Sequence, residues 1–202
     1  MLLYGLIILI AVIIVTLINS LFFLQALGTT VWGVIGLIAL GIVISMVLDV
    51  IGALFIRLIS KKVNHFSKFF DERKGERTFY EKIGVRKFKD KIPELGKTLK
   101  FFDKTKVPEN PNSDYMLMFI HETALAELMH LISILTAPLI LVIMPLKYLL
   151  YISLPIMIVN IFLQIMPIIV QRYTRPKLVA GYKRLLRNEE RLAAEENKAQ
   201  AE

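Results

Sequence analysis

Four polar residues, Glu122, Glu127, His130 and Ser133, lie in a largely apolar stretch in the second half of the chain. At roughly 100° of rotation per residue they share one face of a helix, whereas His121 falls on the opposite side. Glu127 and His130 are three residues apart, close enough for their side chains to touch. A carboxylate that holds one imidazole nitrogen fixes the tautomer and leaves the other nitrogen as a general base. The pattern predicts a catalytic site built on His130, Glu127 and Glu122.

Two other interpretations of the Glu127–His130 pair stay open. Polar side chains also hold transmembrane helices together, so the pair is equally compatible with a packing contact. Glu-x-x-His also occurs in di-iron helix bundles, but those sites need a second such motif and two further carboxylates. Elsewhere in the apolar stretches the only acid is Asp49, so we predict no metal site and no cofactor. The chain has no cysteine, which excludes a thiol nucleophile.

Three more polar residues in the apolar stretches are candidates for the same site. Asp49 is expected either to pair with Arg172 or His130 across the helices or to point alone towards the membrane interface. Asn160 and Gln164 are one helical turn apart, so they are expected to face the same polar interior. Ionisable groups at membrane depth are costly, and each is therefore a functional hypothesis.

Cations gather in two places outside these stretches. Arg172 and Arg175 flank Tyr173 just after the last apolar stretch, where they suit a helix C-terminus or can clamp a phosphate. Residues 86–91 hold four cations and one acid, which attract anionic lipid headgroups or recognise a phosphorylated cosubstrate such as coenzyme A. We predict substrate-binding roles for Arg86, Lys87, Lys89, Gln164, Arg172, Tyr173 and Arg175.

The apolar composition indicates which elements position these residues. Hydrophobic residues make up 55% of the 202 residues, mean hydropathy is +0.59, and no charge precedes Asp49. Such an uncharged run is not the surface of a soluble domain, but it accommodates two membrane spans and a turn at Gly28-Thr29-Thr30. We predict an all-α integral membrane protein with four transmembrane helices, the third of them kinked at Pro138. The spans are expected over about 2–27, 31–59, 116–143 and 148–170.

Charge asymmetry predicts the orientation of these spans. Residues 57–114 contain sixteen Lys and Arg against nine acids, and residues 172–202 contain eight against five. The two other connections carry only Lys147. By the positive-inside rule the 57–114 loop and the tail are cytoplasmic, so four spans place both termini in the cytoplasm. The net charge of +8 is expected to attract anionic membrane lipids and anionic ligands. No nucleic-acid partner is expected.

The chain is thus expected to have four parts. These are a first transmembrane hairpin (1–56), a basic aromatic loop (57–114), a second hairpin with the polar site (115–171) and a charged helical tail (172–202). Aromatic residues alternate with lysines in the loop, which is typical of amphipathic helices at a membrane surface. Expected breaks between its helices are Gly75, Gly84, Pro93, Gly96 and the segment 108–112. Ser113 or Asp114 is expected to cap the third span.

Three segments resemble a known family, the glycosyl-4,4′-diaponeurosporenoate acyltransferases, which act last in staphyloxanthin synthesis. Residues 80–93, Tyr-Glu-Lys-Ile-Gly-Val-Arg-Lys-Phe-Lys-Asp-Lys-Ile-Pro, resemble its loop motif, with Phe88 in place of the usual Trp. Glu122 and residues 126–135 resemble its Glu-x4-Glu-Leu-x-His segment. Residues 167–178 resemble its Gln-Arg-Tyr-Asn-Arg-Pro-Arg-Leu ending, with Thr174 in place of the Asn.

The resemblance implies a multi-pass acyltransferase of the bacterial cell membrane. It would move a fatty acyl chain from a donor such as acyl-CoA to a sugar hydroxyl of a glycosylated carotenoid or related lipid-linked glycoside. His130 would be the base and Glu127 its orienting partner, Glu122 would bind the sugar, and the cations would hold the donor phosphates. The competing hypothesis is a non-enzymatic membrane adaptor or assembly protein held by the basic loop. A lipid reductase or methyltransferase is a third alternative.

Overall fold

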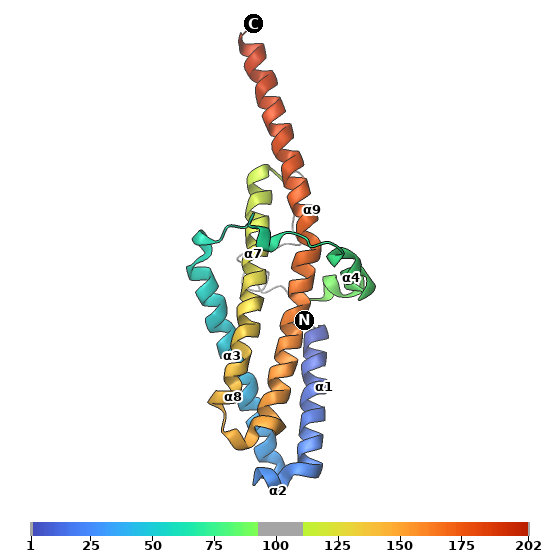
Figure 1. Ribbon diagram of the computed structural model, residues 1–202, viewed down its shortest axis with the longest axis vertical. Helices are drawn as coiled ribbons and strands as arrows, with labels where there is room; N and C mark the ends of the chain where they lie inside the picture. Colours follow the sequence, from blue (N-terminus) through green and yellow to red (C-terminus); the bar gives the residue numbers. More distant parts are fainter. Residues whose placement is uncertain (1, 93–110, 202) are drawn as a thin grey trace.

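Four long apolar helices form the body of the protein, and the charged C-terminal part of the fourth extends from one end of it in the computed structural model (Figure 1). The structure describes residues 2–92 and 111–201. By length and composition, four stretches are able to cross a membrane, namely Leu3–Leu27, Val31–Leu58, Ser113–Ile143 and Leu146–Ala199. The predicted all-α fold with four spans is confirmed.

The first hairpin turns at the residues that the sequence indicated. Helix α1 (Leu2–Ile18) continues through a wider π-helical turn, Asn19–Phe23, into the short α2 (Leu24–Leu27). Gly28 follows with φ +59°, a left-handed conformation that costs glycine little. The Thr30 side chain then accepts a hydrogen bond from the Gly33 amide and caps α3 (Val31–Leu58).

The third span begins about three residues earlier than expected. Helix α7 spans Ser113–Thr136, and its cap is Asn112, not Ser113 or Asp114. The reason is local: Asn112 has extended backbone angles, and its side-chain oxygen accepts from the Tyr115 amide at 2.9 Å. The predicted interruption at Pro138 is present as a tight 3₁₀ turn, Ala137–Leu139, which separates α7 from α8 (Ile140–Ile143).

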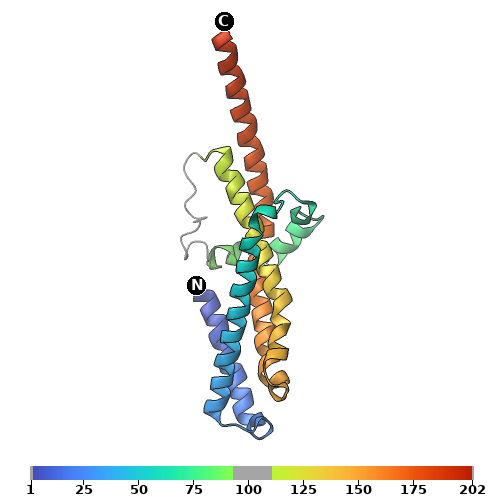
Figure 2. The ribbon, with the colours of Figure 1, turned by 90° about the vertical axis from the view of Figure 1, so that its left-hand side faces the viewer.

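The fourth span and the tail are one helix. Helix α9 (Leu154–Ala201) follows a π-helical turn at Leu149–Ser153 and contains Pro167 and Pro176 without a break. It packs along α7, and α7 also packs against α3. The two short connections lie at one end of the bundle, whereas the basic loop and the tail lie at the other end (Figure 2).

The described first part of the basic loop, residues 57–92, contains short helices and docks on α9. Helices α4 (Glu76–Lys82) and α5 (Val85–Phe88) start after Gly75 and Gly84, whose φ values are +81° and +79°, as predicted for these two breaks. Tyr80 and Val85 are buried against Tyr173 of α9 in a small apolar cluster. The other predicted breaks, at Pro93, Gly96 and 108–110, lie outside the described residues.

Candidate functional site

Glu127 is the centre of an ionic network between α7 and α9. Its side chain is fully buried, and each carboxylate oxygen accepts a hydrogen bond from a different arginine. Arg172 Nη1 donates to Oε1 at 2.8 Å, and Arg175 Nη1 donates to Oε2 at 2.6 Å. The two arginines are three residues apart on α9, so they project from the same face of the helix towards one carboxylate.

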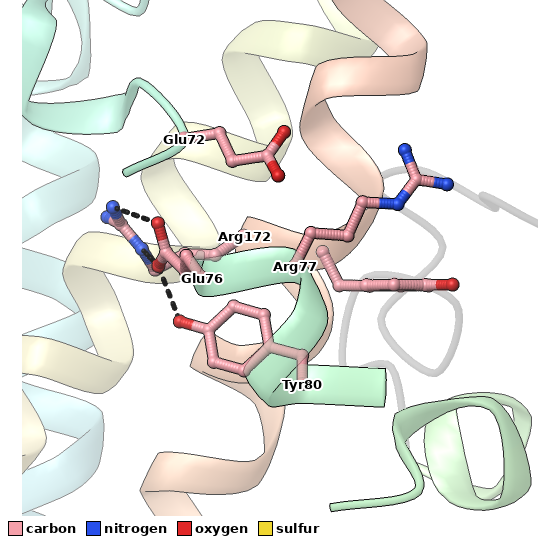
Figure 3. Close-up of a pocket in the computed structure, with 6 residues that line it drawn as sticks. Glu72, Glu76, Arg77, Tyr80 and Arg172 are labelled. Carbon is pink, nitrogen blue, oxygen red and sulfur yellow. Dashed lines mark hydrogen bonds and ion pairs between the residues drawn. The ribbon is translucent and has the colours of Figure 1, made fainter. Parts of the chain in front are cut away.

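The loop contributes a second carboxylate to this network. Glu76, at the first turn of α4, accepts a hydrogen bond from Arg172 Nε and another from the Tyr80 hydroxyl at 2.5 Å (Figure 3). Burial raises the pKa of Glu76, but the hydrogen bonds from Arg172, the Arg73 amide and Tyr80 outweigh it and lower the pKa to about 2. Two arginines thus face two carboxylates, and the charges balance.

Arg175 is the most enclosed cation of the network, with 2% of its surface exposed. Its Nε donates to Thr123 Oγ1 at 3.3 Å, and its guanidinium lies over the Phe70 ring at 4.6 Å. The sequence suggested that Arg172 and Arg175 hold donor phosphates and that Glu127 orients His130. In the structure these three residues form ion pairs with one another, because opposite charges removed from water stabilise one another strongly.

His130 belongs to a second polar cluster deeper in the bundle. Its Nδ1 lies 2.6 Å from Gln164 Oε1 of α9. Gln164 Nε2 donates to Asp49 Oδ2 of α3 at 2.9 Å, and Asn160 Nδ2 donates to Asp49 Oδ1 at 3.4 Å. The expectation that Asn160 and Gln164 face one polar interior is confirmed. Asp49 reaches His130 through Gln164, a connection that the sequence interpretation missed.

Glu122 and His121 have partners that were not predicted. Glu122 forms a bidentate ion pair with Arg57 at the end of α3, and both N–O distances are 2.8 Å. His121 Nδ1 lies 3.3 Å from the Nδ1 of His65 in the basic loop. Burial, followed by the charges of His121 and Arg175, lowers the pKa of His65. The i, i+3 and i, i+4 rules describe one helix at a time, so they gave no signal for these contacts between elements.

Exposed cations surround Tyr173 on the outer side of the docked loop. Arg86 Nε donates to the Tyr173 hydroxyl at 3.1 Å, and its side chain is 67% exposed. Arg77 and Lys177 lie over the Tyr173 ring at 5.9 and 5.8 Å. Lys87 is exposed and Lys89 is partly exposed on the same segment. A crevice beside this surface is lined by Glu72, Glu76, Arg77, Tyr80, Arg172 and Tyr173 (Figure 3).

Four apolar helices, with ionisable groups buried between them and a basic loop docked on one end, define a multi-pass membrane protein with a polar site inside its bundle. The family model of the glycosyl-4,4'-diaponeurosporenoate acyltransferases matches residues 66–184, more than half of the chain, and the chain belongs to this family. It is therefore an acyltransferase of carotenoid biosynthesis that acylates a glycosyl carotenoid. No curated protein and no solved structure matches the chain.

The matched region contains both halves of the ionic network and most of the deeper cluster. Glu76, Glu127 and Arg172 lie within it, as do His130 and Gln164. Three residues that contact these clusters or lie beside them precede the matched region, namely Asp49, Arg57 and His65.

Proposed function

We propose that this acyltransferase moves a fatty acyl group from an acyl-CoA-type thioester directly to a sugar hydroxyl, with His130 as the general base. The hydroxyl oxygen forms a bond to the thioester carbonyl carbon while its proton moves to His130 Nε2. The C–S bond then breaks, and the departing thiolate recovers a proton from the imidazolium. The products are the ester and the free thiol, and the step requires no covalent acyl-enzyme.

The contact between His130 and Gln164 carries this proposal. An amide oxygen can only accept, so a 2.6 Å approach of His130 Nδ1 to Gln164 Oε1 makes Nδ1 the protonated nitrogen. Nε2 then bears the lone pair that a base needs. Gln164, predicted as a substrate contact, is better assigned to holding the base.

The ionic network supports the site without touching the reacting atoms. Glu127 joins α7 to Arg172 and Arg175 of α9 three residues before His130 on the same helix. This network fixes the spacing of the two helices that carry His130 and Gln164. We therefore propose a positioning role for Glu127 and for both arginines, and the same role for Glu122 through its pair with Arg57.

The donor phosphates are best accommodated on the exposed cations of the docked loop. Arg86, Lys87 and Lys89 lie outside the apolar spans, where a hydrophilic phosphate group stays in water while its acyl chain enters the bundle. Lys and Arg both bind phosphate well in such positions. Acyl-CoA is a cytoplasmic metabolite, and the loop that would bind it is rich in Lys and Arg. We therefore place the loop and both termini in the cytoplasm.

The test is acyl transfer by the purified protein from acyl-CoA to a glycosyl carotenoid, followed by mass spectrometry of the lipid. His130→Gln should reduce turnover by about a hundredfold to ten-thousandfold, the usual contribution of general-base catalysis. Glutamine retains hydrogen bonding but cannot accept the proton. His121→Gln, on the opposite face of α7, is the matched control and should retain turnover. A fully active His130→Gln protein with unchanged unfolding temperature would reject the base.

A further inference from the structure

One hydrogen-bonded path joins three transmembrane helices in the middle of the bundle. It runs from Asp49 of α3 through the Gln164 side chain of α9 to His130 of α7. Asp49 is the only acid in α3, and the sequence segment that identifies the family begins after it. A carboxylate at membrane depth is costly, so its presence at this position calls for a role.

We propose that Asp49 is a positioning residue that sets the tautomer of His130 by fixing the side-chain amide of Gln164. The inference rests on the proposed function in one respect only, namely that the tautomer makes His130 Nε2 the base for acyl transfer. The structural part, which nitrogen of His130 carries the proton, stands on the geometry alone.

Donor and acceptor chemistry gives the direction of the path. An ionised Asp49 only accepts hydrogen bonds, so the amide nitrogen of Gln164, not its oxygen, must face it at 2.9 Å. The amide oxygen then necessarily faces His130, which must donate from Nδ1. Without the carboxylate, the Gln164 amide can turn by 180° at almost no change in shape. It would then present its NH₂ group to Nδ1 and drive the proton to Nε2.

Asp49 is itself held by three donors. Gln164 Nε2 donates to Oδ2, Asn160 Nδ2 donates to Oδ1, and the Ser133 hydroxyl forms a further side-chain hydrogen bond. The second hydrogen of Gln164 Nε2 points to Asn160 Oδ1, 3.2 Å away. All of these neighbours donate towards Asp49 in this geometry, so the carboxylate is the acceptor at this end of the path.

The experiment reads the tautomer directly. The chain has three histidines, so protein with ¹⁵N- and ¹³C-labelled histidine in lipid bilayers gives three sets of ring signals, and His130→Gln assigns one of them. We expect the Nδ1–H tautomer for His130 in the unmodified protein. Asp49→Asn retains only one acceptor oxygen; with that oxygen accepting from Asn160 and the NH₂ group turned to Gln164, the Gln164 amide should turn and His130 should change to Nε2–H. The signals of His65 and His121 should not move.

A double variant makes the test independent of folding losses. Asp49→Asn combined with Gln164→Glu exchanges the carboxylate and the amide, so residue 164 accepts from the NH₂ group of residue 49 and again accepts from His130 Nδ1. It should restore the Nδ1–H tautomer and acyl transfer, after a loss of at least tenfold in Asp49→Asn alone. An unchanged tautomer in Asp49→Asn, or no restoration in the double variant, would overturn the inference. A changed tautomer with full acyl transfer would uphold the path and instead reject His130 as the base.

Discussion

Arg175 of α9 donates to Glu127 of α7 over 2.6 Å at a place where neither side chain is more than 3% exposed. Coulomb attraction is strong there because little water screens it. The same carboxylate also pairs with Arg172, so one residue of α7 fixes two residues of α9. Breaking such a buried pair from one side leaves an uncompensated charge. The ionic network is therefore expected to be a main determinant of how these two helices are held together.

Glu127→Gln should lower the free energy of unfolding by about 3–5 kcal/mol, the usual cost of removing one partner from a buried ion pair. Chemical unfolding in detergent measures this value. Glu190→Gln, an exposed change on the tail of α9, is the control and should have little effect. A Glu127→Gln protein as stable as the unmodified protein would mean that the arginines are neutralised elsewhere.

The sequence predicted the parts of the fold that depend on local patterns. Long uncharged runs determine spans, Gly28 marks the first turn, and Pro138 marks the end of α7. The shared helix face also pointed correctly to His130 and Gln164 as residues of the polar interior. Each of these signals lies within one helix or one turn, so spacing along the chain is sufficient to read it.

The pairing of charges could not be predicted in the same way. Glu76 and Arg172 are 96 residues apart, and Asp49 and Gln164 are 115 residues apart. The sequence offered Asp49 as a partner for Arg172, whereas Arg172 pairs with Glu76 and Glu127, because spacing along the chain does not rank contacts between helices. The i, i+3 rule favoured Glu127 for His130, but it gave no signal for the two cations on α9 that pair with the same carboxylate. Spacing within one helix therefore does not show which charges on another helix reach it.

The contact between Glu76 and Arg172 should make stability depend on pH. A pKa lowered from 4.5 to about 2 means that this contribution is fully present above about pH 4.5 and is lost as the pH falls through about 2. Glu76→Gln should therefore lower the unfolding temperature at pH 7, and its difference from the unmodified protein should shrink between pH 4.5 and 2. Glu72→Gln, an exposed change in the same crevice, is the control. A difference that is constant across this range would contradict the assignment.

The proposed orientation is open to cysteine labelling, since the chain has no cysteine of its own. Lys74→Cys lies on the exposed basic loop, and Leu146→Cys lies on the exposed connection at the opposite end of the bundle. A membrane-impermeant maleimide applied to intact cells should label residue 146 and spare residue 74. Labelling of residue 74 after lysis would show that it is reactive. The reverse pattern in intact cells would invert the topology and place the donor cations outside.

The exposed cations of the loop should govern affinity for the phosphates of the donor. Lys87→Gln combined with Lys89→Gln removes two such cations, each worth up to about 1 kcal/mol at an exposed position. A loss of about 1.4 kcal/mol changes a binding constant tenfold, so the KM for acyl-CoA should rise about tenfold. The KM for an acyl thioester of N-acetylcysteamine, which lacks phosphates, should not change. Lys183→Gln with Arg184→Gln, equal in charge but placed on the exposed tail, should leave both KM values unaltered. An equal rise in KM for both thioesters would mean that the two lysines act on the reacting groups or on the fold. An unchanged KM for acyl-CoA would reject this surface as the phosphate site.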